Sequence, residues 1–162
     1  MAGKKIIWGA AVMAAIIAVL LLFCFGFSPT YLVLTNGDTG EVLGEFPVQS
    51  GDEFSVSFVH SVNNSSVTDV YEIRGNSIYV IRTVYYAFGA GVQTELDEGQ
   101  TLEYGEDGAM IVSGFDKRMD NLSYIVGTVS DHVLEINGRS VSLRELCGKN
   151  TCVRFSVRHK LF

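Results

Sequence analysis

His60, Ser61 and Glu72 are the residues whose types and spacing could do chemistry. A carboxylate beside a histidine raises the pKa of the imidazole and fixes its tautomer, and a neighbouring serine hydroxyl can then act as a nucleophile. If successive strands pair, we expect the three side chains to meet near one edge of a sheet. A glycine-rich corner follows further along the chain. The candidate ligand or partner site therefore contains His60, Ser61, Glu72, Phe88, Gly89 and Gly91.

Three interpretations of this site are open at the level of sequence. A hydrolase would use His60, Ser61 and Glu72, but adjacent residues of one strand point to opposite faces, which disfavours proton transfer between His60 and Ser61. A binding site would need no such transfer. A structural network, with Glu72 holding a histidine at the rim of the core, would need none either. The opposite faces of His60 and Ser61 lead us to favour binding over catalysis. The glycines are not a phosphate loop, because no helix follows them, and we expect no cofactor.

An acidic stretch offers a weaker candidate, since Ca²⁺ prefers several carboxylate ligands. The spacing of an EF-hand is missing, so we expect a solvated loop and no metal site. The stretch contains Glu95, Asp97, Glu98, Glu103, Glu106 and Asp107.

The elements that must position these residues are strands. Short β-branched and aromatic runs alternate with Gly, Asn, Asp and Ser, and no window after residue 30 keeps a helical period. We expect an all-β domain, an antiparallel sandwich or open barrel of about ten short strands. The expected strands are Tyr31–Thr35, Glu41–Val48, Glu53–His60, Thr68–Arg74, Ser77–Tyr86, Thr101–Tyr104, Ala109–Ser113, Ser123–Val129, His132–Ile136, Arg139–Leu143 and Thr151–His159.

Four local patterns refine this expectation. Asn137-Gly138 favours a two-residue type I′ hairpin turn. A single helical turn is expected around residues 142–147. The run 77–86 is apolar at successive positions, which predicts a central strand covered on both faces. Alternation along 53–60 puts His60 in line with the apolar residues of that strand, at the rim of the core.

The first part of the chain predicts a membrane anchor. The 22 residues from Ile6 to Phe27 carry no charge and span roughly 33 Å as a helix, enough for a bilayer core of about 30 Å. Lys4 and Lys5 precede the run, and no Lys or Arg follows until Arg74, which places the N-terminus in the cytoplasm. We expect a single-pass protein of the cell membrane with a cytoplasmic segment 1–5, a transmembrane helix 6–27 and an extracytoplasmic domain 28–162. A cleaved signal peptide, or lipidation at Cys24, are the alternatives.

Composition agrees with this division. The 162 residues are 48% hydrophobic, with a mean hydropathy of +0.26. All 18 acidic and ten of the twelve basic residues lie in 28–162, which gives that part a net charge of −8. This excess of acid argues against a nucleic-acid partner, because phosphate binding needs Lys and Arg.

Two cysteines fall in the part expected outside the cytoplasm. An oxidising compartment permits disulfides, and the residues between Cys147 and Cys152 favour a turn. The spacing is not that of a redox-active or zinc-binding pair. We expect a structural disulfide between Cys147 and Cys152.

The same segments resemble a known family. His60-Ser61-Val62, Glu72 and Gly89-Ala90-Gly91 are similar to the signature of the DUF1850 family, and the resemblance covers roughly Tyr31 to Leu143. Members are typically encoded beside TRAP transporters of the TAXI type. The resemblance implies an accessory role, in contact with a transporter subunit or its solute-binding protein. A small-solute or cation-binding module is the first alternative, and the hydrolase is the second.

Overall fold

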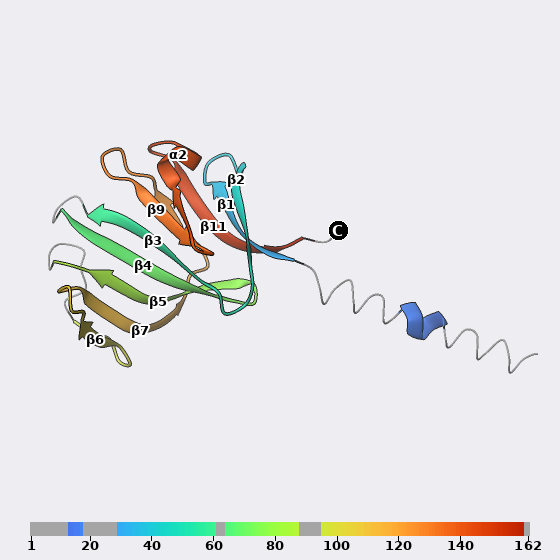
Figure 1. Ribbon diagram of the computed structural model, residues 1–162. Helices are drawn as coiled ribbons and strands as arrows, with labels where there is room; N and C mark the ends of the chain where they lie inside the picture. The colour runs from blue at the N-terminus through green and yellow to red at the C-terminus, as the bar shows by residue number, and fades with distance from the viewer. Residues whose placement is uncertain (1–12, 18–28, 61–63, 88–94, 161–162) are drawn as a thin grey trace, which may run out of the picture.

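The computed structural model describes residues 13–17, 29–60, 64–87 and 95–160. In this part of the chain, eleven strands form two open antiparallel sheets (Figure 1). This confirms the all-β prediction. The smaller sheet has the order β2-β1-β11-β8, made of β1 (Thr30–Asn36), β2 (Val42–Val48), β8 (Ser123–Ile125) and β11 (Cys152–His159).

The larger sheet has the order β10-β9-β3-β4-β5-β7-β6. Its central strands form a meander, in which each strand pairs with the next along the chain. The seven strands are β3 (Glu53–His60), β4 (Ser65–Arg74), β5 (Ser77–Tyr85), β6 (Thr101–Tyr104), β7 (Met110–Arg118), β9 (His132–Ile136) and β10 (Arg139–Ser142).

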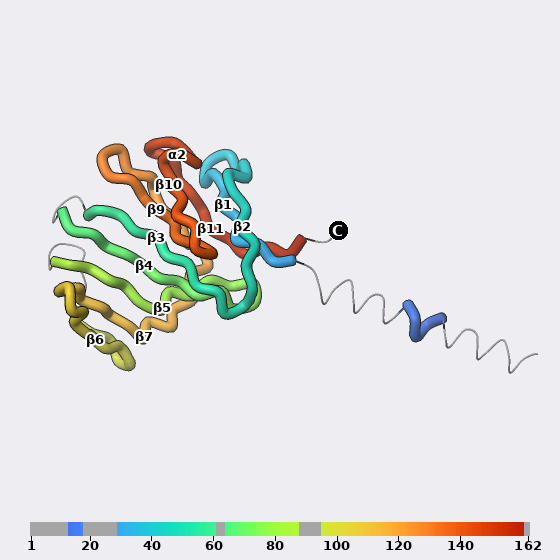
Figure 2. Tube along the Cα trace, viewed as in Figure 1, coloured from blue at the N-terminus to red at the C-terminus, as the bar shows by residue number. Residues whose placement is uncertain are grey.

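The main apolar core lies between the two sheets. Leu32 and Leu34 of β1 belong to the same buried cluster as Val56 of β3 and Leu134 of β9, and all four are fully buried. The alternation of strand side chains explains this, because each strand directs every second residue to the core. Figure 2 shows the start of β1 beside the end of β11, where the backbone N–H of Lys160 donates to the carbonyl of Pro29.

A second apolar cluster lies on the larger sheet alone. It contains Val67, Tyr85, Met110 and Val112, with no member from the smaller sheet among the described residues. Figure 1 shows β6 and β7 at the far side of the larger sheet from the labelled strands β1, β2 and β11 of the smaller sheet. The core is therefore divided into a part that both sheets share and a part that one sheet carries.

Local sequence signals explain two of the connections. Asn137 and Gly138 both have positive φ, 52° and 70°, as the predicted type I′ turn requires. The expected helical turn is α2 (Leu143–Cys147), whose N-cap residue Ser142 accepts a hydrogen bond from the backbone N–H of Glu145.

The prediction for strand 77–86 is only partly correct. β5 is an interior strand, but most of its side chains are only half-buried, so it is not covered on both faces. The register of β5 against β4 shifts between Val70 and Tyr71, because one extra residue, Ile81, lies between the partners Val80 and Arg82. This bulge changes which residues face inward along the rest of the strand.

The predicted disulfide is wrong, because Cys147 and Cys152 are free thiols. Cys147 ends α2 and packs against the main core, and burial raises the pKa of its thiol to about 11. Cys152 begins β11, where the next residue, Val153, faces the core, so the Cys152 side chain points to the opposite face. There it lies against Gly37, at which an added Cβ would come within 2.6 Å of the Cys152 sulfur.

Of the predicted membrane anchor, only residues 13–17 are described, and they are helical with exposed side chains. No helix within the described ranges is long and apolar enough to cross a bilayer. The other residues of the segment 6–27 lie outside the described part of the chain.

Candidate functional site

The β3–β4 register separates His60 from Glu72. His60 is opposite Ser65 at one end of the hairpin, and Glu72 is opposite Glu53 at the other. Seven positions along a strand correspond to about 23 Å. The expectation that His60 and Glu72 meet is therefore wrong, and the reason is that antiparallel pairing brings together residues equally far from the turn.

The other predicted site residues, Ser61, Phe88, Gly89 and Gly91, lie outside the described residues. The strands that lead to them are described. β3 and β5 both pair antiparallel with β4, so their last residues lie at the same end of the sheet. His60 ends β3 and Tyr85 ends β5, so the chain leaves both strands at one end of the larger sheet. We name this the signature end.

A carboxylate faces inward near the boundary between the two apolar clusters. Asp69 lies on β4 opposite Val56 on β3 and opposite Thr83 on β5. One carboxylate oxygen accepts a hydrogen bond from the Thr83 hydroxyl at 2.8 Å, and the other accepts one from the Tyr124 hydroxyl at 2.8 Å. The Tyr124 hydroxyl is also 2.5 Å from that of Tyr71. We call Asp69, Tyr71, Thr83 and Tyr124 the inward polar cluster.

The two phenols of this cluster remain protonated. Burial raises the pKa of both Tyr71 and Tyr124 well above the ordinary value, and the nearby Asp69 carboxylate raises both further. A protonated phenol donates to the carboxylate, whereas a phenolate would repel it. The cluster therefore consists of a carboxylate acceptor with fixed donors and two phenols that remain neutral.

His132 lies beside the cluster. Its ring stacks on Phe58 at a centroid distance of 5.1 Å and is 5.6 Å from the Tyr124 ring. Burial lowers the pKa of His132, which outweighs the opposite effect of Asp131, and the Arg144 charge lowers it further. Nδ1 accepts a hydrogen bond from the Gly127 backbone N–H at 3.3 Å, so the neutral ring carries its proton on Nε2. His132 therefore acts as a neutral stacking residue.

Ser65 adds an unusual polar group at the signature end. It is 9% exposed and is paired with His60 across the hairpin. Its hydroxyl has no hydrogen-bond partner among the described residues. Buried polar atoms are nearly always hydrogen-bonded, so an unpartnered hydroxyl on this face is a departure from the rule.

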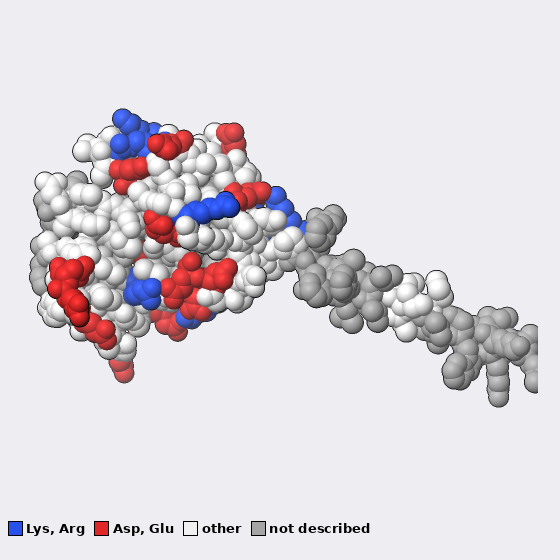
Figure 3. Space-filling model, viewed as in Figure 1, with Lys and Arg blue, Asp and Glu red and all other residues white. Residues whose placement is uncertain are grey.

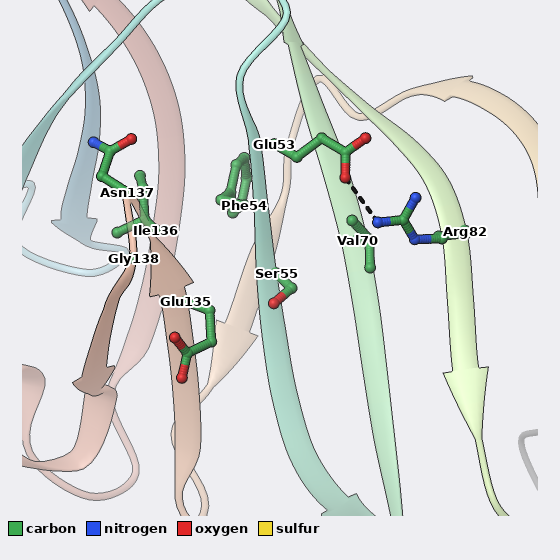
Figure 4. A pocket seen from close by; sticks show the side chains of 9 residues that line it. All are labelled: Glu53, Phe54, Ser55, Val70, Arg82, Glu135, Ile136, Asn137 and Gly138. Carbon is green, nitrogen blue, oxygen red and sulfur yellow. Dashed lines mark hydrogen bonds and ion pairs between the residues drawn. The ribbon is translucent and has the colours of Figure 1, made fainter. Parts of the chain in front are cut away.

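A shallow hollow lies on the opposite, outward face of the larger sheet. Figure 4 shows Ser55 and Val70 between Glu135 on one side and the Glu53–Arg82 ion pair on the other. The hollow has a volume of about 280 Å³, and the Arg82 nitrogen is 2.8 Å from the Glu53 oxygen.

Glu72 belongs to this outward face, because it lies opposite Glu53 in the β3–β4 register. Its carboxylate accepts two hydrogen bonds from the Arg74 guanidinium at 2.7 and 2.9 Å. Glu72 therefore pairs with an arginine, and its structural role is unrelated to His60.

The acid-rich segment is exposed. Figure 3 shows acidic side chains gathered over the β6 end of the larger sheet. Glu95, Asp97, Glu98, Glu103, Glu106 and Asp107 are all exposed. Within the described residues, no three His, Cys, Asp or Glu side chains converge as a metal site would require.

The alternation of side chains along β4 contains a signal for Asp69. Val67, Tyr71 and Ile73 are apolar at alternate positions, and Asp69 occupies the same alternation. An acid in line with core residues must find hydrogen-bond donors inside the fold. Tyr124 follows the same logic, because it alternates with the buried residue Val126. His132 carried no comparable signal.

Comparison with known families gives one match. A family model described as "Domain of unknown function (DUF1850)" matches residues 54–143, more than half of the chain. No curated protein matches the chain. No solved structure matches it either. The matched region runs from the start of β3 to the start of α2, so it contains the larger sheet and the inward polar cluster.

Proposed function

The chain belongs to the DUF1850 family, and on this premise we propose that it is a membrane-anchored interaction module. The segment 6–27 holds the domain at the outer face of the cell membrane. There the domain binds a subunit of a TAXI-type TRAP transporter, or the solute-binding protein of that transporter. The signature end of the larger sheet is the contact surface.

The observation that carries this proposal is a group of exposed apolar side chains at the signature end. Val59 is 42% exposed, Tyr86 is 48% exposed and Val129 is 92% exposed. Val59 pairs with Ser66 of β4, and the next residue of β4, Val67, pairs with Tyr85, so Val59 and Tyr86 lie at the same end of the sheet on either side of β4. We call Val59, Tyr86 and Val129 the apolar rim.

Val129 reaches this group from another part of the chain. The hydroxyl of the next residue, Ser130, donates to the carbonyl of Val59 at 3.1 Å, which holds the β8–β9 connection against the end of β3. Apolar side chains grouped at one end of a domain favour contact with a protein partner. The rim also lies beside His60, the residue that carries the family resemblance.

Other features support binding over catalysis. The register places the Glu72 carboxylate about 23 Å from His60 along the sheet, so Glu72 does not orient that histidine. In the inward polar cluster, the pKa values of the Tyr71 and Tyr124 phenols are raised, and the Asp69 carboxylate has fixed hydrogen-bond donors. These properties favour a structural or binding role for the cluster.

A photo-crosslinking experiment tests the proposal. A photoreactive phenylalanine analogue replaces Val59 in the full-length chain, in cells that produce the transporter proteins. We expect covalent adducts with a transporter subunit or with the solute-binding protein, identified by mass spectrometry. Ile125, 66% exposed on the smaller sheet, is the matched control position and should give no such adduct. Equal adducts from both positions, or none from Val59, would contradict the proposed contact surface.

A further inference from the structure

The smaller sheet carries two arginines on the face that points away from the core. Val153 and Phe155 of β11 are buried, at 0% and 4% exposure, and face the core. Side chains alternate along a strand, so Arg154 and Arg158 point to the other face with Ser156 between them. Four residues of strand separate their Cα atoms by about 13 Å.

A hollow of about 300 Å³ opens on this face. It crosses β11, with the β1–β2 turn on one side and residues 120–122 on the other. This volume is at the lower end of the range for small-molecule sites. The polar groups that line it include Thr35, Asn36, Asn121, Arg154, Ser156 and Arg158.

The hydrogen bonds of the turn orient one of these groups. The Asn36 Oδ1 atom accepts from the backbone N–H groups of Asp38 and Thr39, at 2.9 and 3.1 Å. The side-chain oxygen is thereby used within the turn, and the NH₂ group is left to donate elsewhere. The hollow thus has a neutral donor besides its two guanidinium groups.

The charges around the hollow are unbalanced in favour of cations. Neither Arg154 nor Arg158 forms an ion pair with a described residue. The carboxylate in the lining, Asp120, is already bonded to Arg118, whose Nε is 2.6 Å from the Asp120 oxygen. The domain as a whole has more acidic than basic residues. The guanidinium groups of Arg154 and Arg158 are nevertheless available to an external anion.

We propose that this hollow binds a small organic dianion, with one carboxylate or phosphate group toward each of Arg154 and Arg158. A guanidinium group presents a planar fork of donors that matches both kinds of oxyanion. The side chains are flexible enough for their ends to approach a ligand shorter than the 13 Å that separates the Cα atoms. The NH₂ group of Asn36 supplies a further donor to one of the two anionic groups, whereas the Ser156 hydroxyl already donates to the Val33 carbonyl at 3.4 Å.

Isothermal titration calorimetry on the full-length chain in detergent tests this site. The probes are glutarate, adipate and inorganic phosphate, each at constant ionic strength because salt screens exposed charges. We expect saturable binding of at least one of these anions and none of glutaramide, which is neutral. The stronger of the carboxylate and phosphate arms identifies the anionic group that the site prefers.

Variants then locate the binding. Arg154→Gln and Arg158→Gln should each weaken binding by about tenfold or more, the loss expected for a charge-assisted hydrogen bond. Arg139→Gln is the matched control, since Arg139 is exposed on β10 and forms no ion pair with a described residue.

Two results would overturn the proposal: no saturable binding of any anion up to tens of millimolar, or equal binding by all three variants. The comparison of glutarate with glutaramide needs no variant, so it decides the question even where a substitution impairs folding. The apolar rim lies on the other sheet, and failure here leaves the proposed interaction function intact.

Discussion

Asp69 illustrates how a single residue departs from the pattern around it. It occupies a position where the neighbouring inward side chains, Val67 and Tyr71, are buried. A carboxylate there is stable only because the hydroxyl groups of Thr83 and Tyr124 donate to it. The interior of the larger sheet therefore depends on a specific set of donors as well as on apolar packing. His132, packed against Tyr124, is the titratable neighbour of this set.

His132 predicts a pH dependence of stability. Its pKa is lowered in the folded protein, so below about pH 6.5 the unfolded chain takes up a proton that the folded chain does not. The free energy of unfolding should therefore fall as the pH drops from 7.5 to about 5.5, by at most about 1.4 kcal/mol per pH unit from this residue. Urea denaturation at several pH values measures it.

The controls for this prediction use two further histidine variants. His132→Phe keeps the stacking on Phe58 but cannot titrate, so its stability should vary less with pH than that of the wild type. His159→Gln, at an exposed position, gives the slope measured when a different histidine is removed. An unchanged slope in His132→Phe would show that His132 is not the group responsible.

At the scale of elements, pairing register decides which residues meet. The limits of β3, β6 and β9 coincide with the predicted strands, because alternation and turn residues mark them clearly. No sequence pattern indicates the bulge at Ile81. The bulge moves the side chains of Thr83 and Tyr85 to the inward face of the sheet. Local patterns thus define where strands lie, while bulges and register define which face each side chain occupies.

Gly114 on β7 gives a prediction at this scale. Its φ is +83°, and a Cβ added there would lie 2.4 Å from the Gly99 carbonyl oxygen. Gly114→Ala should destabilise the domain by several kcal/mol, because backbone strain and a backbone clash add together. Gly138→Ala is the matched control, since Gly138 has φ +70° and open space around it, and it should cost only about 1–2 kcal/mol. Thermal unfolding measures the stability of both variants. Equal losses of stability would show that the clash with the Gly99 carbonyl does not contribute.

The whole molecule combines an acidic domain with an apolar N-terminal segment. The first strand and the last lie side by side, and the hydrogen bond from Lys160 to Pro29 joins their ends. An anchor before residue 29 would therefore hold one end of the smaller sheet near the membrane. With a net charge of −8, a domain held there would be repelled by anionic lipid over most of its surface.

Reporter fusions test this arrangement. If the domain lies outside the cytoplasm, as proposed, alkaline phosphatase attached to the carboxyl end of the full-length chain should be active. Green fluorescent protein at the same place should then be dark. Ile16→Arg, in the middle of the apolar run, should release the fusion from the membrane fraction, because a central arginine costs about 2.5–3.5 kcal/mol on insertion. Fluorescent fusions without phosphatase activity would contradict the orientation.

The amino-acid sequence by itself determined the all-β class, most strand positions, the Asn137-Gly138 turn, the short helical turn around residues 142–147 and the family. These depend on contacts between residues close in the chain, which composition and alternation record. Only the tertiary structure decided that His60 and Glu72 lie far apart, that Cys147 and Cys152 face different sides, and that Asp69 meets Tyr124. Those relations depend on register and on sheet-to-sheet packing, which sum many weak long-range contacts that no local pattern encodes.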